Sequence, residues 1–133
     1  MLRSLVVVLS FTFCLTALGN SEVEKRRNKI IKIINLELKE VERLSNSQGE
    51  RDPDLLLRLA ELYLEKARLY RERENNNYLK LDPKKRQRVN KRKYFATSSR
   101  FFKKANQICL KITSRYRNYS KLGEVYYILG YNL

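Results

Sequence analysis

The 133-residue sequence predicts an all-α fold. It contains only four Gly and two Pro, which is few for a sheet connected by many tight turns. Long segments without either residue carry apolar side chains at three- and four-residue spacing, which is the period of one helix face. Because 43% of the residues are hydrophobic, one small domain can form a core. We therefore expect antiparallel helical hairpins preceded by an N-terminal amphipathic helix.

The first segment, residues 1–19, has the pattern of a secretory signal peptide. Arg3 precedes an uncharged apolar run from Leu5 to Leu18, and the small residues Ala17 and Gly19 stand at the spacing that signal peptidase prefers. The run is shorter than the roughly twenty residues of a membrane span, which makes an uncleaved anchor the weaker alternative. We expect cleavage after Gly19 and export. A helical, basic chain that is poor in cysteine then suggests a periplasmic or envelope-associated bacterial protein.

The next segment, residues 20–50, is predicted to be an amphipathic helix followed by a linker. Its apolar stripe recurs at three- and four-residue steps and requires another element to cover it; it contains Ile31, Ile34, Leu38 and Val41. Ser21 followed by Glu24 resembles a capping box at the helix start. The polar residues 45–52 are predicted to form the linker.

Residues 51–133 are predicted to form the main helical region. Asp52-Pro53 and Asp82-Pro83 each combine an N-cap acceptor with a proline suited to the first helical turn. The helix that begins at Asp52-Pro53 is expected to end at Asn75–Asn77. A later helix follows the apolar line Ser98, Phe102, Ala105, Cys109, Ile112 and Tyr116, a turn covers residues 117–121, and a final helix starts near residue 124.

A strongly basic run lies between these helices and contributes to the net charge of +15. We expect it to be a solvated insertion that contacts an acidic partner, through Lys84, Lys85, Arg86, Arg88, Lys91, Arg92 and Lys93. The alternative is binding of a polyanion such as nucleic acid, anionic lipid or a cell-wall polymer. Residues 84–93 contain no aromatic residue for base stacking, so nucleic acid is the less favoured polyanion and a membrane surface stays open.

Three short patterns resemble the tetratricopeptide (TPR) repeat. The first is Leu56-x-x-Leu59-Ala60-x-x-Tyr63, and the second, of the same spacing, is Tyr126-x-x-Leu129-Gly130-x-x-Leu133. Between them, Ala105-x-x-x-Cys109-x-x-Ile112 resembles the second helix of a repeat. The family carries an aromatic residue in place of Cys109 and an alanine in place of Ile112. The distance from Ala60 to Ala105 also exceeds the hairpin of a repeat of about 34 residues. Either both helices are longer than in the family, or a basic insertion lies between them at residues 71–93.

The resemblance covers roughly residues 55–133 and is closest to exported TPR proteins of the bacterial envelope. It implies a fragment of an α-solenoid, in which Ala60, Ala105 and Gly130 let neighbouring helices approach closely and stacked hairpins bind proteins on their concave face. On this resemblance the last repeat would be incomplete, so we expect Tyr126, Leu129 and Leu133 to be exposed and to need a cover. That cover would be a partner protein, a second copy, or the rest of a longer TPR protein of which this chain is an N-terminal fragment without function alone.

The composition offers little for catalysis. The sequence has no His and two Cys, and it shows no Gly-rich phosphate loop or cluster of metal ligands. We therefore assign no catalytic, cofactor-binding or metal-binding residue and expect an interaction scaffold rather than an enzyme. Cys109 lies on an apolar line and is expected to be a small buried residue. Arg68, Arg71 and Arg73 could clamp a peptide carboxylate, although nothing in the sequence sets their direction.

Overall fold

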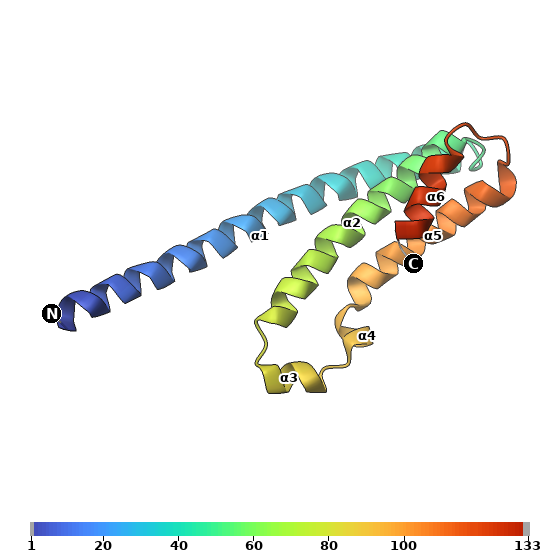
Figure 1. The fold of residues 1–133 in the computed structure, drawn as a ribbon. Helices are drawn as coiled ribbons and strands as arrows, with labels where there is room; N and C mark the ends of the chain where they lie inside the picture. The colour runs from blue at the N-terminus through green and yellow to red at the C-terminus, as the bar shows by residue number, and fades with distance from the viewer. Residues whose placement is uncertain (1, 132–133) are drawn as a thin grey trace. The chain divides into compact units, whose positions relative to one another are not determined.

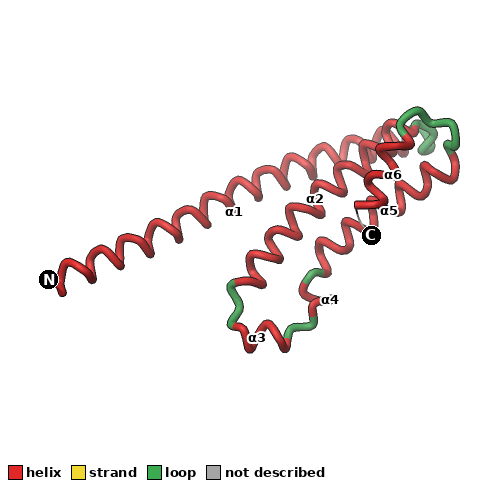
Figure 2. The backbone as a smooth tube through the Cα atoms, in the orientation of Figure 1, coloured by secondary structure: helices red, strands yellow, loops and turns green. Residues whose placement is uncertain are grey.

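A computed structural model describes the backbone of residues 2–131 and the side chains of residues 21–131. Within this part of the chain all regular structure is helical, in six helices without a strand, which confirms the all-α prediction (Figures 1 and 2). The chain divides into two compact units, Met1–Ile33 and Ile34–Leu133.

The first unit is the N-terminal part of helix α1 (Leu2–Ser47). The predicted helix start at Ser21 is wrong, because the helix begins at Leu2 and continues through Ser21 without a break. Glu24 instead pairs with Arg27 one turn later, and Glu22 pairs with Arg26 at 3.5 Å. The side chains of the predicted signal peptide, residues 1–19, lie outside the described residues, so that assignment stays a prediction.

The second unit is built around an antiparallel pair of long helices, α2 (Pro53–Leu79) and α5 (Ala96–Arg115). The short helices α3 (Pro83–Arg88) and α4 (Lys91–Tyr94) connect them at one end (Figure 2). At the other end, α6 (Leu122–Tyr131) returns along both long helices (Figure 1). Residues 34–47 of α1 complete the unit.

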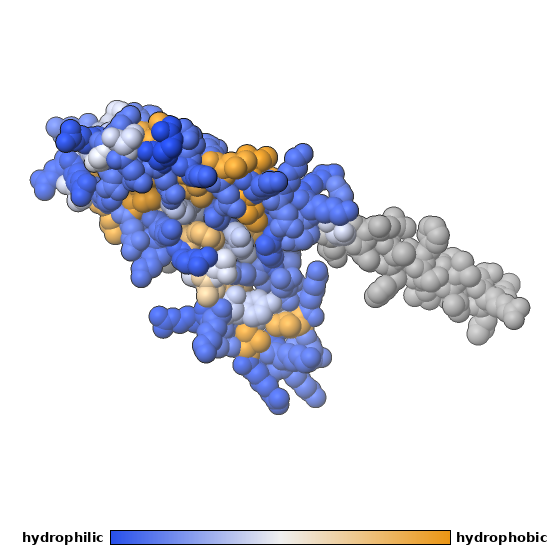
Figure 3. All heavy atoms as spheres, turned by 180° about the vertical axis from the view of Figure 1, so that it is seen from behind, coloured by the Kyte–Doolittle hydropathy of each residue, from blue (hydrophilic) through white to orange (hydrophobic). Residues whose placement is uncertain are grey.

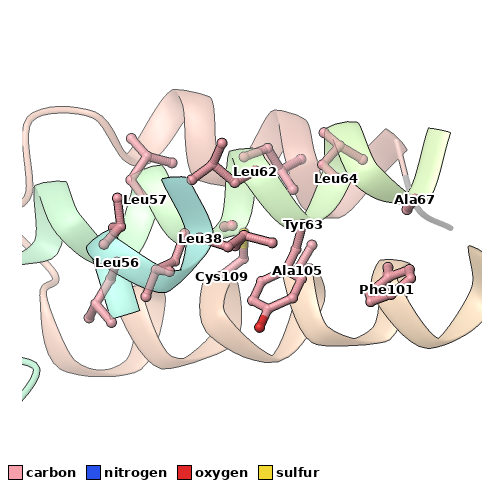
Figure 4. Close-up of a cluster of buried hydrophobic side chains, with 14 of the residues drawn as sticks. Leu38, Leu56, Leu57, Leu62, Tyr63, Leu64, Ala67, Phe101, Ala105 and Cys109 are labelled. Carbon is pink, nitrogen blue, oxygen red and sulfur yellow. The ribbon is translucent and has the colours of Figure 1, made fainter. Parts of the chain in front are cut away.

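The core of this unit lies between α1, α2, α5 and α6 (Figure 4). Small residues stand where the helices meet: Ala60, Ala67, Ala105 and Cys109 have no exposed surface. Larger side chains fill the space around them; among them are Ile34, Leu38, Val41, Leu56, Leu57, Leu62, Tyr63, Phe101, Ile112, Val125 and Ile128. The apolar stripe of α1 from Ile34 onward therefore packs as predicted.

The start of α2 confirms the predicted cap, whereas its end does not. Asp52 accepts hydrogen bonds from the backbone N–H groups of Asp54 (2.8 Å) and Leu55 (3.4 Å), and Pro53 occupies the first turn. The predicted end at Asn75–Asn77 is wrong, because the helix continues to Leu79. Its last turn is held by Tyr78, whose ring packs against the rings of Tyr94 and Phe95 on the far side of α3. Such tertiary packing overrides the local propensity of the asparagines.

Helix α5 receives its N-terminal cap from another helix. Phe95 at its N-cap position provides no side-chain hydrogen bond. The carboxylate of Glu74 on α2 instead accepts from the N–H groups of Thr97 and Ser98, both at 3.2 Å, and from the Ser98 hydroxyl. Along α5, Phe101 is the buried phenylalanine, while Phe102 on the predicted apolar line is only half-buried.

The connection between α1 and α2 is shorter than the predicted linker, because α1 continues to Ser47. Gly49 has a φ of 63°, a left-handed conformation that glycine adopts without strain, and Glu50 follows at 56°. The Glu50 carboxylate binds Lys111 at 2.7 Å, and the Tyr116 hydroxyl donates to the Glu50 carbonyl at 2.9 Å. Contacts with the far end of α5 therefore hold this unusual backbone in place.

Candidate functional site

The turn before α6 sets the position of that helix. Tyr119 and Lys121 both donate to the Asp54 carboxylate at the start of α2, at 2.7 and 2.8 Å. This anchor directs α6 back along the hairpin, where Val125 and Ile128 enter the core. These two residues carry the packing of α6, and neither belongs to the TPR-like pattern predicted for this segment.

Outside its core contact, α6 is exposed and carries three tyrosines. Tyr126, Tyr127 and Tyr131 expose 58, 66 and 53% of their surface. Gly130 is also exposed, and a Cβ added there would meet no atom within 4 Å. The expected close helix approach at Gly130 is therefore absent in the described structure. Single exposed aromatics are ordinary, but three on a ten-residue helix mark a surface that another element can cover.

A hollow of about 610 Å³ runs along α5 beside the end of α6. We call it the α5 groove. It is lined by Arg71, Ser99, Phe102, Lys103, Asn106, Gln107, Leu110 and Tyr131. Leu110 exposes 57% of its surface at the floor of this groove. Two cations and no carboxylate occur among these lining residues.

A second hollow, of about 660 Å³, lies between α2 and α6 and has a different character. Its lining carries both signs of charge, with Arg58, Glu61, Glu65, Arg68 and Glu124. Arg58 is already engaged by Glu37 and Glu61, and the Arg68 guanidinium lies 4.2 Å from the centroid of the Tyr131 ring. Because its lining mixes both signs of charge and Arg58 is already paired, this hollow favours an acidic partner less than the α5 groove does.

The predicted TPR-like packing residues fall into two groups. Those of α2 and α5 come together in one core and are buried: Leu56, Leu59, Ala60, Tyr63, Ala105, Cys109 and Ile112. Those of α6 do not join it in the same way, since Tyr126 and Gly130 are exposed and Leu129 is half-buried. Leu133 lies outside the described residues.

Cys109 is fully buried between the helices. Burial raises the pKa of its thiol to about 11, so the nucleophilic thiolate is scarce at neutral pH. The side chain acts as a small packing residue.

The three arginines considered as a carboxylate clamp do not converge. Arg71 lines the α5 groove and stacks over Phe95 at 4.8 Å, whereas Arg68 lies over Tyr131 beside the other hollow. Arg73 lies over the Tyr70 ring at 5.3 Å. A single clamp formed by all three is therefore wrong, because each guanidinium is held by a different aromatic ring.

The predicted basic residues lie on α3 and α4, on either side of the break at Val89–Asn90. Among Lys84, Lys85, Arg86, Arg88, Lys91, Arg92 and Lys93, only Arg86 is half-buried and the others are exposed. They form a continuous basic surface at the end of the α2–α5 hairpin. Sequence reasoning missed the aromatic cluster that supports this surface, in which Tyr78, Tyr94 and Phe95 pack with ring centroids 5.5 to 5.8 Å apart.

Within the described residues, no helix is long and apolar enough to cross a membrane. No group of three or more His, Cys, Asp or Glu side chains in this part of the chain is arranged to hold a metal ion.

Comparison with known proteins gives no relative from which a role could be transferred. No protein-family model, curated protein or solved structure matches the chain. The TPR resemblance therefore rests on the residues alone.

Proposed function

We propose that the chain is a non-catalytic interaction scaffold whose α5 groove and exposed α6 face dock an acidic amphipathic helix of a partner protein. The observation that carries the proposal is the α5 groove, because this open hollow has an exposed leucine and the exposed Tyr131 of α6 in its lining.

The spacing of the groove residues favours a helical partner. The α5 side chains that line the groove, from Ser99 through Phe102 and Asn106 to Leu110, recur at steps of three and four. They therefore form one stripe along the helix axis. A second helix can lay its apolar face along such a stripe and insert its ridges between these side chains.

The charge of the groove favours an acidic partner. Arg71 and Lys103 are its ionic lining residues, and the whole chain carries a net charge of +15. Carboxylates flanking the apolar stripe of a partner helix would pair with these cations and increase the rate of encounter. A second copy would bring the same excess of positive charge to the interface, which makes it the less suitable occupant.

The wider setting of the scaffold belongs to the same proposal. The buried small residues Ala60 and Ala105 support a TPR-like hairpin, and the pattern of residues 1–19 supports export to a bacterial envelope. In a longer TPR protein, the helix following α6 would be the natural cover for the groove. We assign the groove to a helix of a separate partner protein.

A pair of synthetic peptides tests the groove. The probe is an amphipathic helical peptide with a leucine stripe flanked by glutamates, and its counterpart has lysine in place of each glutamate. We expect fluorescence anisotropy to detect binding of the acidic peptide and little binding of the basic one. Leu110→Glu and Lys103→Glu should each weaken binding of the acidic peptide by about tenfold or more, since each removes a groove contact and adds repulsion.

Matched controls separate the groove from general charge. Leu79→Glu changes another exposed leucine, and Lys84→Glu makes the same charge change on α3; both should bind the acidic peptide nearly as wild type does. Equal weakening by control and groove variants would overturn the proposal. A concentration-dependent dimer that Leu110→Glu abolishes would overturn the choice of partner, because a second copy would then occupy the groove.

A further inference from the structure

The end of the α2–α5 hairpin carries a dense basic surface that the docking of a helix does not use. We call residues 80–93 the basic tip. Eight basic side chains lie in it against one carboxylate, Asp82, and seven of the eight are exposed. The basic tip comprises α3, the break at Val89–Asn90 and the first three residues of α4.

Local contacts give the basic tip a defined shape. Asp82 caps α3 by accepting from the Lys84 N–H at 2.9 Å, and Asn90 caps α4 by accepting from the Lys93 N–H at 3.2 Å. The Tyr78 hydroxyl donates to the Arg86 carbonyl at 3.4 Å and links α3 to the end of α2. The basic side chains are thus presented from short helices that are fastened to the hairpin.

An apolar residue stands at the edge of this charged surface. Leu79, the last residue of α2, exposes 64% of its surface and directly precedes Lys80. In Figure 3, apolar atoms lie among the polar ones at the end of the unit that α3 occupies. An open hollow of about 570 Å³ lies next to α3, and its lining includes the cations Arg86 and Lys91 with no carboxylate among its described residues.

We propose that the basic tip binds the surface of an anionic lipid bilayer, with Leu79 inserting at the headgroup boundary. Each Lys or Arg held near such a surface gains on the order of 1 kcal/mol from its negative potential. An exposed leucine beside the cations adds burial of apolar surface in the interface. The hollow beside Arg86 and Lys91 provides space for a lipid phosphate.

The aromatic residues favour a bilayer over nucleic acid. A protein that binds single-stranded nucleic acid offers free aromatic faces on which bases stack. Here Tyr78, Tyr94 and Phe95 pack against one another, and Arg71 also covers the Phe95 ring at 4.8 Å. Nucleic acid would therefore use only the phosphate attraction of the basic tip and would leave Leu79 in water.

Vesicle binding by the full chain tests the proposal. The probes are vesicles of pure phosphatidylcholine and of phosphatidylcholine mixed with phosphatidylglycerol, measured by co-sedimentation at low and high NaCl. Comparison of the two lipids is needed because the apolar run from Leu5 to Leu18 can associate with either vesicle. We expect tighter binding to the anionic vesicles and a steep loss of this difference with salt.

Two variants define the contribution of the basic tip. Replacing its seven basic residues between 84 and 93 by Gln should lower binding to anionic vesicles by at least about 100-fold at low salt. Leu79→Ser should lower it by about tenfold and leave the salt dependence in place, because it removes apolar burial without removing charge. Circular dichroism verifies that both variants retain their helices.

A charge-matched control variant and a competing polyanion can each overturn the lipid-binding proposal. Replacing Lys25, Arg26, Lys29 and Lys32 by Gln in α1 should change the anionic preference far less than an equal number of replacements in the basic tip. Equal effects would overturn the proposal, because binding would then follow total charge. Tighter binding to duplex DNA or RNA than to anionic vesicles at the same salt, unaffected by Leu79→Ser, would overturn it in favour of nucleic acid. The docking proposal would be unaffected, since neither Leu110 nor Lys103 is changed.

Discussion

At the scale of single residues, Glu74 is a buried acid with a structural task. The residue is 8% exposed, and its carboxylate accepts hydrogen bonds from two backbone N–H groups and the Ser98 hydroxyl at the start of α5. An α-helix leaves its first N–H groups without partners inside the helix, and Phe95 at the N-cap position has no side-chain acceptor to offer. Glu74 therefore joins the far end of α2 to the beginning of α5.

We expect Glu74→Ala to destabilise the fold by about 1–3 kcal/mol, because it leaves donors at the start of α5 without an acceptor. Urea denaturation followed by circular dichroism measures the change. Glu74→Gln should recover part of the loss, since its amide oxygen can still accept. Glu65→Ala on the exposed side of the same helix is the control, and a loss of stability as large as that of Glu74→Ala would refute the capping role.

At the scale of elements, the start of α2 was more predictable than its end. Asp52-Pro53 carries its own cap and proline, so two adjacent residues determine where α2 begins. The end of α2 depends on Tyr78 meeting Tyr94 and Phe95, residues that come after α3, and no pattern near Asn75–Asn77 reveals that contact. The cap from Glu74 was not predictable for the same reason, because Thr97 and Ser98 lie more than twenty residues further along the chain.

The candidate site shows a similar division. The periodicity of α2 and α5 was sufficient to predict buried Ala60, Ala105 and Cys109, because a helix covered on one face must bury its apolar stripe. The α5 groove was not predictable in this way. Whether Leu110 is covered depends on where α6 crosses, and that crossing depends on the hydrogen bonds of Tyr119 and Lys121 to Asp54.

These connections also predict how the fold responds to acid. The hydrogen bond from Lys121, followed by that from Tyr119, holds the pKa of Asp54 below its usual 3.8, and the hydrogen bond from Lys111 lowers the pKa of Glu50 below 4.5. A carboxyl group with a lowered folded-state pKa stabilises the fold when ionised. Its contribution is complete above the ordinary pKa and is lost as the pH falls through the folded-state value.

We therefore expect the Tm to fall as the pH drops below about 4.5, and to fall less steeply in the double variant Lys111→Gln, Lys121→Gln. Thermal melts followed by circular dichroism between about pH 6 and pH 3 measure the slope. The double variant Lys85→Gln, Lys91→Gln makes the same change in net charge away from these carboxylates and should keep the wild-type slope. If both double variants flatten it equally, the effect belongs to net charge and not to these two connections.

At the scale of the whole molecule, positive charge exceeds negative charge by a wide margin. The chain has 29 basic and 14 acidic residues, so many cations lack an acidic neighbour. Exposed ion pairs such as Arg43 with Glu40 contribute little each, whereas repulsion among the remaining cations grows as the chain becomes compact. Repulsion is therefore expected to outweigh the surface pairs in the folded state.

Salt should consequently stabilise the fold, because it screens this repulsion more than it weakens the few pairs. We expect the Tm to rise by roughly a few degrees between low salt and about 0.5 M NaCl, measured by circular dichroism at pH 7. In the variant with seven Gln in the basic tip, the low-salt Tm should be higher and its rise with salt smaller, because the densest group of cations is gone.

A Tm that falls with salt in the wild type would mean that the ion pairs outweigh the repulsion. An equal rise in both proteins would mean that the basic tip does not contribute to this repulsion. The repulsion would then arise among the cations of the long helices.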